Sequence, residues 1–115
     1  INLGIAGIPR DRVRLHVCWG NWEGPHLFDI ELRKVLSIFL KAKVGAMSIE
    51  FANPRHAHEY PILDEVGFTK DMLLIPGVIE SKSNFIEHPE LIAQRIGRYA
   101  KLVGRENVIA ASACG

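Results

Sequence analysis

The chain has few of the features that mark several common classes of protein. Its 115 residues include only two cysteines, Cys18 and Cys114, which are too few for a disulfide framework and favour reduced thiols in a cytoplasmic protein. The formal net charge of +1 argues against a nucleic-acid-binding surface. No apolar run reaches the about 18–20 residues that a membrane-spanning helix needs, so no membrane partner is expected. The N-terminus also lacks the charged and apolar regions of a signal peptide.

What the chain does have is apolar sequence divided into short runs. Apolar residues make up 48% of it before its 10 glycines are counted, whereas about 45–50% is usual with glycine included. Such a content favours strands that are covered on both faces, as in α/β folds. Four runs of seven or eight residues have the length of strands rather than helices. They are residues 12–18, 45–51, 72–78 and 107–114.

The segments between these runs carry helix signals. Apolar residues recur at helical spacing over residues 32–40, and Asp29 is a candidate N-cap for that helix. Residues 89–104 begin with proline and end with glycine, the usual punctuation of a helix. The connection over residues 53–66 is less regular, because Pro61 should interrupt a helix there.

Alternating strands and helices predict crossover units and a parallel sheet, hence an α/β fold. Four strands with three helices correspond to half of a (β/α)₈ barrel, and an open doubly wound sheet is the alternative. We expect residues 1–115 to be the last four strands of a parallel TIM-barrel fragment. The chain begins with Ile1 and ends directly after its fourth run, which reads as a piece of a longer protein. Half a barrel leaves two sheet edges unpaired, so the isolated chain is expected to aggregate, dimerise or fold poorly.

Metal-binding residue types fall at the C-terminal ends of three predicted strands. Because side chains alternate along a strand, His16 and Cys18 share one face, and Glu50 and Cys114 end two other strands on the corresponding face. Ligand sites in parallel α/β proteins form at this edge. Imidazole, thiolate and carboxylate all bind zinc, and sulfur favours zinc over magnesium or calcium. The alternative is an ordinary core with two buried thiols, a hydrogen-bonded histidine and an ion-paired glutamate.

The composition of this ligand set indicates a type of chemistry. With two thiolates and a carboxylate around it, a zinc ion is a weak Lewis acid toward water. It can still hold an incoming thiol as its thiolate, because a coordinated thiol is deprotonated. The site therefore suits alkylation of sulfur better than hydrolysis.

The chain contains, in this order, HVCWGNWEGPH, SIEFANPRHAHEY, LLIPGVIESKSNFIEHPELIAQRI and YAKLVGRENVIAASACG. These segments resemble the C-terminal catalytic barrel of cobalamin-independent methionine synthase, and most closely its shorter relatives, which include epoxyalkane:coenzyme M transferase. The resemblance implies a zinc-dependent S-methyl- or S-alkyltransferase with an N-terminal half-barrel that is missing here. The zinc ligands that it implies are His16, Cys18, Glu50 and Cys114.

The resemblance also implies the substrates. In methionine synthases the thiol is homocysteine and the donor is 5-methyltetrahydrofolate, whereas the coenzyme M relatives join coenzyme M to an epoxide carbon. Two positions depart from the family pattern. Ala113 stands where the family has Asp before the last cysteine, and Lys82 stands where methionine synthases carry a histidine thought to donate a proton. The first departure would remove a supporting hydrogen bond or weaken metal binding. The second favours a relative with another alkyl donor or thiol. A zinc-binding domain without turnover is the further alternative.

Other residues are candidates for contact with substrate. Family members carry a segment similar to the one that contains Arg55, His56 and Glu59 beside the pocket, so His56 is a candidate catalytic residue, although an ordinary solvated helix start explains the segment as well. Glu80 is a second candidate, as a hydrogen-bond acceptor. Trp19 directly follows the first ligand strand and could line the pocket, or could pack on a neighbouring helix.

Overall fold

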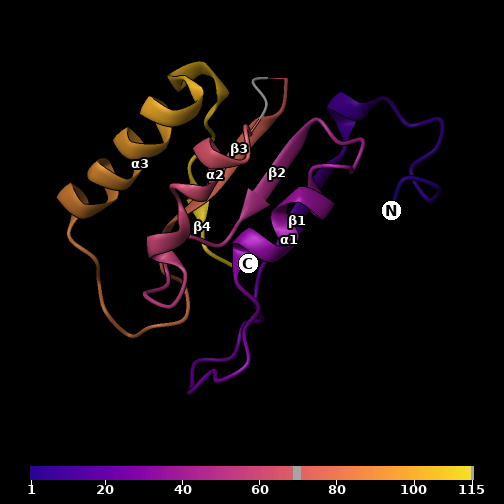
Figure 1. Cartoon of the computed structure of the whole chain (residues 1–115). Helices are drawn as coiled ribbons and strands as arrows, with labels where there is room; N and C mark the ends of the chain where they lie inside the picture. Colours follow the sequence, from indigo (N-terminus) through magenta and orange to yellow (C-terminus); the bar gives the residue numbers. More distant parts are fainter. Residues whose placement is uncertain (69–70, 115) are drawn as a thin grey trace.

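The computed structural model describes residues 1–68 and 71–114. Within these residues, four parallel strands form one sheet whose spatial order, β1-β2-β3-β4, is their order along the chain (Figure 1). The strands are β1 (Arg14–Val17), β2 (Ala46–Ile49), β3 (Leu73–Ile79) and β4 (Ala111–Ser112). The predicted α/β fold with a parallel sheet is therefore confirmed.

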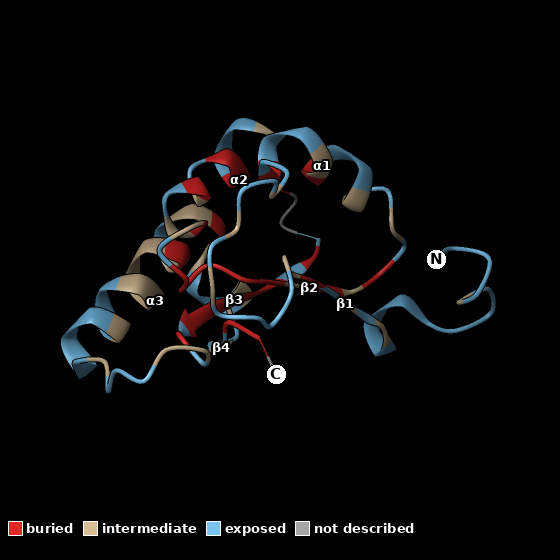
Figure 2. Cartoon of the chain, turned by 90° about the horizontal axis from the view of Figure 1, so that it is seen from below, coloured by how far each residue is buried: buried red, intermediate tan, exposed pale blue. Residues whose placement is uncertain are grey.

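The helices lie on one side of the sheet (Figure 2). They are α1 (Leu32–Phe39), α2 (Ile62–Glu65) and α3 (Pro89–Val103). The chain also contains short 3₁₀ turns, which are η1 (Arg10–Arg12), η2 (Ala57–Glu59) and η3 (Arg105–Asn107). Helix α3 ends at Gly104, whose φ of 89° is costly for other residues. None of the helices in the described part of the chain is both long and apolar enough to cross a membrane.

The core lies between the sheet and these helices. Leu32 and Leu36 of α1 are fully buried with Met47 of β2, and Tyr99 of α3 is buried in the same cluster. Burying each such aliphatic side chain contributes about 1.5–3 kcal/mol. The apolar stripe predicted over residues 32–40 is thus confirmed as the face of α1 that holds the helix on the sheet.

The opposite face of the sheet is lined by a different row of side chains. Parallel pairing places His16 beside Ser48 and Ser48 beside Ile75. These three residues, with residues from β1 and β4, line a hollow of about 390 Å³. Because side chains alternate along each strand, one set faces the helices and the other set faces the hollow.

Two predicted details need correction, and a third is confirmed. Strand β4 spans only two residues, because η3 occupies the start of the predicted 107–114 strand and a register irregularity interrupts its pairing with β3. Asp29 is not the N-cap of α1. The helix begins after Glu31, and the Asp29 carboxylate bonds to histidines instead. Pro61 does divide the middle connection, between η2 and α2, as predicted.

Candidate metal centre

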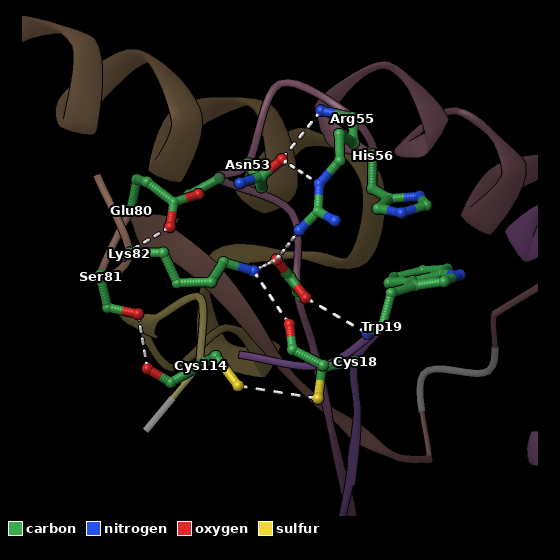
Figure 3. Close-up of polar contacts among 12 residues, drawn as sticks. Cys18, Trp19, Asn53, Arg55, His56, Glu80, Ser81, Lys82 and Cys114 are labelled. Atoms are coloured by element: carbon green, nitrogen blue, oxygen red, sulfur yellow. Dashed lines mark hydrogen bonds and ion pairs between the residues drawn. The ribbon is translucent and has the colours of Figure 1, made fainter. Parts of the chain in front are cut away.

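Three of the four predicted ligands meet at the C-terminal edge of the sheet. The sulfurs of Cys18 and Cys114 lie 3.6 Å apart, and the Cys114 sulfur lies 3.8 Å from Nε2 of His16. All three ligand atoms lie within 4.8 Å of one another. Figure 3 shows the two sulfurs facing each other. His16 and Cys114, 98 positions apart in sequence, thus lie close together although they belong to the two outer strand regions of the sheet.

The strands orient these side chains. His16 is inside β1, and its Nδ1 hydrogen-bonds to Oγ of Ser48 on the neighbouring strand at 3.0 Å. This contact turns Nε2 toward Cys114, in the way that outer partners commonly orient a metal-binding imidazole. Cys18 follows β1 directly and is on the same side of the sheet as His16, because the two residues are separated by one position.

Cys114 is positioned by close backbone packing rather than by a long strand. A Cβ on Gly77 would lie 2.5 Å from Cα of Ala113, so β3 can approach this segment only with glycine there. The Ser81 hydroxyl donates to the Cys114 carbonyl at 2.7 Å. Ala113 is fully buried. Ala113 therefore lies against the glycine of β3.

The surroundings of Cys114 oppose its ionisation. Burial raises the pKa of the Cys114 thiol above its ordinary value of 9.0, and the hydrogen bond and charge of Cys18 act in the same direction. The negative charge of Glu50 also raises this pKa, and the positive charge of Lys82 partly offsets the rise. A thiolate pair at this position therefore needs a cation to stabilise it.

Glu50, the fourth predicted ligand, is fully buried but lies outside the three-residue group. Its Oε1 forms an ion pair with Nζ of Lys82, and its Oε2 accepts from the backbone N–H of Trp19 at 3.3 Å. Nη2 of Arg55 lies 3.9 Å from the same Oε1. Both carboxylate oxygens thus have protein partners, and ligation of a metal by Glu50 stays a prediction.

His56 is held in a buried polar network. Its Nδ1 lies 2.8 Å from Oε2 of Glu59 and its Nε2 lies 3.0 Å from Oδ2 of Asp29. Its ring stacks on Trp19 with 3.7 Å between centroids. The other Glu59 oxygen accepts from the backbone N–H of Leu32 at 2.8 Å, which satisfies a free donor at the start of α1. These contacts assign His56 a bracing position, and its catalytic role stays a prediction.

Glu80 shapes the turn that follows β3. Its Oε1 accepts from the backbone N–H of Lys82 at 2.8 Å, and its own N–H donates to Glu87. Its Oε2 is buried without a hydrogen-bond partner. The turn delivers the Lys82 side chain, which is 2% exposed, to Glu50. The predicted substrate contact of Glu80 is untested by this arrangement.

The aromatic loop after β1 divides into two parts. Trp19 is partly buried against the core, and its Nε1 donates to the Ile30 carbonyl at 2.7 Å. Trp22 is 62% exposed and stacks on His26. Trp19 therefore packs on His56 and the hydrophobic core. Trp22 is exposed to solvent.

Chemistry and distance both fit a thiophilic cation. Two sulfurs that are each about 2.3 Å from a tetrahedral ion lie about 3.8 Å apart, which is close to the observed 3.6 Å. Two sulfurs and an imidazole nitrogen also form a donor set typical of zinc. The positions of these ligand atoms are therefore compatible with one shared zinc ion.

Sequence reasoning missed the partners of the predicted ligands. Ser48 was given no role, and Lys82 was noted only as a departure from a family pattern. Asp29 was predicted only as a helix cap and Glu59 only as a member of the segment around His56, so their hydrogen bonds to His56 were not foreseen. The pairing of Lys82 with Glu50 depends on a turn that folds back over the strand ends, and residue spacing does not specify such a fold.

Comparisons with known proteins give distant relatives. The chain is 23% identical to "2-hydroxypropyl-CoM lyase" from Xanthobacter autotrophicus over 99% of its own length and 37% of that protein's. It is 25% identical to "Uncharacterized protein YxjH" from Bacillus subtilis over its whole length and 30% of that protein's. The chain thus spans about a third of the length of these curated relatives. No family model matches it. No solved structure matches it either.

Proposed function

We propose that this chain is part of a zinc-dependent enzyme that joins a small-molecule thiol to an alkyl carbon. The observation that carries the proposal is the convergence of His16, Cys18 and Cys114 at the C-terminal strand edge. The distant similarity to a 2-hydroxypropyl-CoM lyase supports it, because forming or cleaving a carbon–sulfur bond is the chemistry that the donor set suits.

The three side chains would hold the ion, with two thiolate charges and a neutral imidazole. When bound, such an ion lowers the pKa of a coordinating thiol and so supplies a thiolate nucleophile at neutral pH. The protein itself supplies orientation, through Ser48 on His16 and Ser81 on the Cys114 carbonyl. The buried pair of Glu50 and Lys82 adds no net charge to the site.

The reaction balances as a nucleophilic displacement. The substrate S–H bond breaks and its proton passes to solvent, a sulfur–carbon bond forms, and the bond from that carbon to its leaving atom breaks. With an epoxide the leaving atom is the ring oxygen, which then takes up a proton. With a methylated folate it is the folate nitrogen, which likewise takes up a proton. A lyase runs the same bond changes in reverse.

Two substrate pairs fit this scheme. One is an epoxide with coenzyme M, and the other is 5-methyltetrahydrofolate with a homocysteine-like thiol, as in methionine synthesis. Lys82 in place of the family's histidine and the similarity to the coenzyme M lyase favour the first. Two free thiols are also in keeping with a reducing, cytoplasmic compartment.

We further propose that the four strands are the C-terminal half of a (β/α)₈ barrel. The sheet order follows the chain without the reversal that marks a doubly wound fold. The helices cover one side of the sheet (Figure 2), as they do outside a barrel. The hollow on the other side would then face the barrel interior, and the rest of the protein would supply its remaining strands.

The proposal is tested by X-ray absorption at the zinc edge on the full-length protein. We expect two sulfur ligands at about 2.3 Å before thiol addition and three afterwards, with coenzyme M and homocysteine as the thiols tested. Incubation with propylene oxide or 5-methyltetrahydrofolate should then give an S-alkylated product, detected by its mass. A zinc site that never gains a third sulfur would identify a closed, non-catalytic zinc domain instead.

A further inference from the structure

The ion pair between Lys82 and Glu50 lies beside the metal-binding residues but is not explained by metal binding alone. The Lys82 side chain is 2% exposed and the Glu50 side chain is fully buried. A buried ion pair costs several kcal/mol per charge in desolvation, so it is weak evidence for stability by itself. Its position next to Cys18 and Cys114 suggests a task in the site.

The Lys82 side chain is held in place by contacts of its ammonium group and of its backbone. Its Nζ pairs with Oε1 of Glu50 and also donates to the carbonyl of Gly20 at 3.4 Å. The backbone N–H of Lys82 donates to Glu80, which fixes the turn from which the side chain extends (Figure 3). The ammonium is therefore held between the loop after β1 and the strand end of β2.

Each oxygen of the Glu50 carboxylate already has a protein partner. Lys82 occupies Oε1, and the N–H of Trp19 occupies Oε2. Glu50 nonetheless lies near enough to Cys114 for its charge to influence that thiol. Without Lys82, the Glu50 carboxylate would be free to bind a divalent cation held by the neighbouring metal-binding residues.

We propose that Lys82 is a positioning residue that keeps Glu50 out of the metal's ligand set and so preserves a place for the substrate thiol. This inference rests on the proposed function, because it concerns access of a thiol to the same ion. It differs from the four-ligand set that the sequence resemblance implied. The carboxylate remains as a buried counter-charge to Lys82 instead of becoming a fourth protein ligand.

The experiment uses the full-length protein loaded with Co²⁺, whose visible spectrum reports the ligands. Lys82→Met removes the ammonium but keeps much of the side-chain volume. We expect this variant to gain an oxygen ligand in X-ray absorption and to bind coenzyme M at least about tenfold more weakly, since the thiol must displace Glu50. The double variant Lys82→Met with Glu50→Gln should recover thiol binding, because no carboxylate remains to compete.

Two further variants separate this role from a structural one. Lys82→Arg retains the positive charge and should keep the wild-type ligand set. Lys34→Met removes a lysine from an exposed pair with Glu31 at 3.1 Å and should change neither the spectrum nor thiol affinity. These controls are informative even if Lys82→Met folds poorly, because the double variant removes both charges of the Lys82–Glu50 pair.

The outcomes distinguish this inference from the proposed function. A wild-type site that already has an oxygen ligand, lost in Glu50→Gln, overturns the inference but leaves thiol alkylation intact. Unchanged ligands and thiol affinity in Lys82→Met overturn it as well. Wild-type protein that binds Co²⁺ without sulfur ligands overturns both.

Discussion

The approach of β3 to the segment that carries Cys114 allows a sharp prediction for Gly77→Ala. An ideal Cβ at Gly77 would lie 2.5 Å from Cα of Ala113 and 3.1 Å from its Cβ. Carbon atoms in contact normally lie about 3.5–4.0 Å apart, so the backbone at Ala113 must move by about 1 Å. Metal sites tolerate changes of only about 0.2 Å in ligand distance. Cys114, the next residue, should therefore be displaced from the ligand group.

The expected effect of Gly77→Ala is a zinc affinity lower by about 10–100-fold, the range seen when the support of a metal ligand is removed. Overpacking should also lower the free energy of unfolding by about 1–3 kcal/mol. Competition with a chromophoric chelator measures the first, and urea denaturation the second. Gly97→Ala in α3 is the matched control, because its added Cβ meets nothing within 4 Å. Equal zinc affinity in the two variants would refute the reasoning.

Further predictions concern stability, each measured by urea denaturation of the full-length protein. Leu36→Ala should cost about 2–5 kcal/mol because Leu36 is fully buried, whereas Ile38→Ala, 60% exposed on the same helix, should change stability by less than about 0.5 kcal/mol. Glu59→Ala should cost about 1–3 kcal/mol, because the N–H of Leu32 and His56 both lose a buried acceptor; a loss no larger than that of the exposed Glu65→Ala would contradict this. Burial raises the pKa of Asp29, but hydrogen bonds from His26 and His56 outweigh it and hold that pKa below 3.8. Its stabilisation is thus present above about pH 4 and lost as the pH falls further, and Asp29→Asn should flatten that acid decline; an unchanged slope would exclude the contribution.

Much of the fold follows from local patterns in the sequence. The helical stripe from Leu32 to Leu40 and the proline and glycine that bound α3 are local signals, and the structure confirms both helices. The parallel sheet follows from alternating strands and helices. The short β4 could not be predicted, because its pairing depends on the close contact between Gly77 and Ala113 rather than on its own apolar run.

The site shows the same division between local and tertiary causes. Alternation in β1 placed His16 and Cys18 on one face. Cys114 reaches them although β1 and β4 are the two outer strands of the sheet, so its approach depends on the tertiary course of the chain after β4. The role of Glu50 depends on its partner, because a glutamate buried at this position can either bind a metal ion or form an ion pair with a lysine. Likewise, His56 is held by Asp29 and Glu59, whose pairing depends on how α1 docks, and this is a tertiary property.

The most direct test of the account is the zinc content of the full-length protein and of two variants. Wild-type protein should retain about one zinc ion per chain after dialysis, Cys114→Ser should lose it, and Ser112→Ala, two residues away on the uncovered sheet face, should keep it. Zinc retained in Cys114→Ser, or absent from the wild-type protein, would contradict the claim that His16, Cys18 and Cys114 bind one metal ion together.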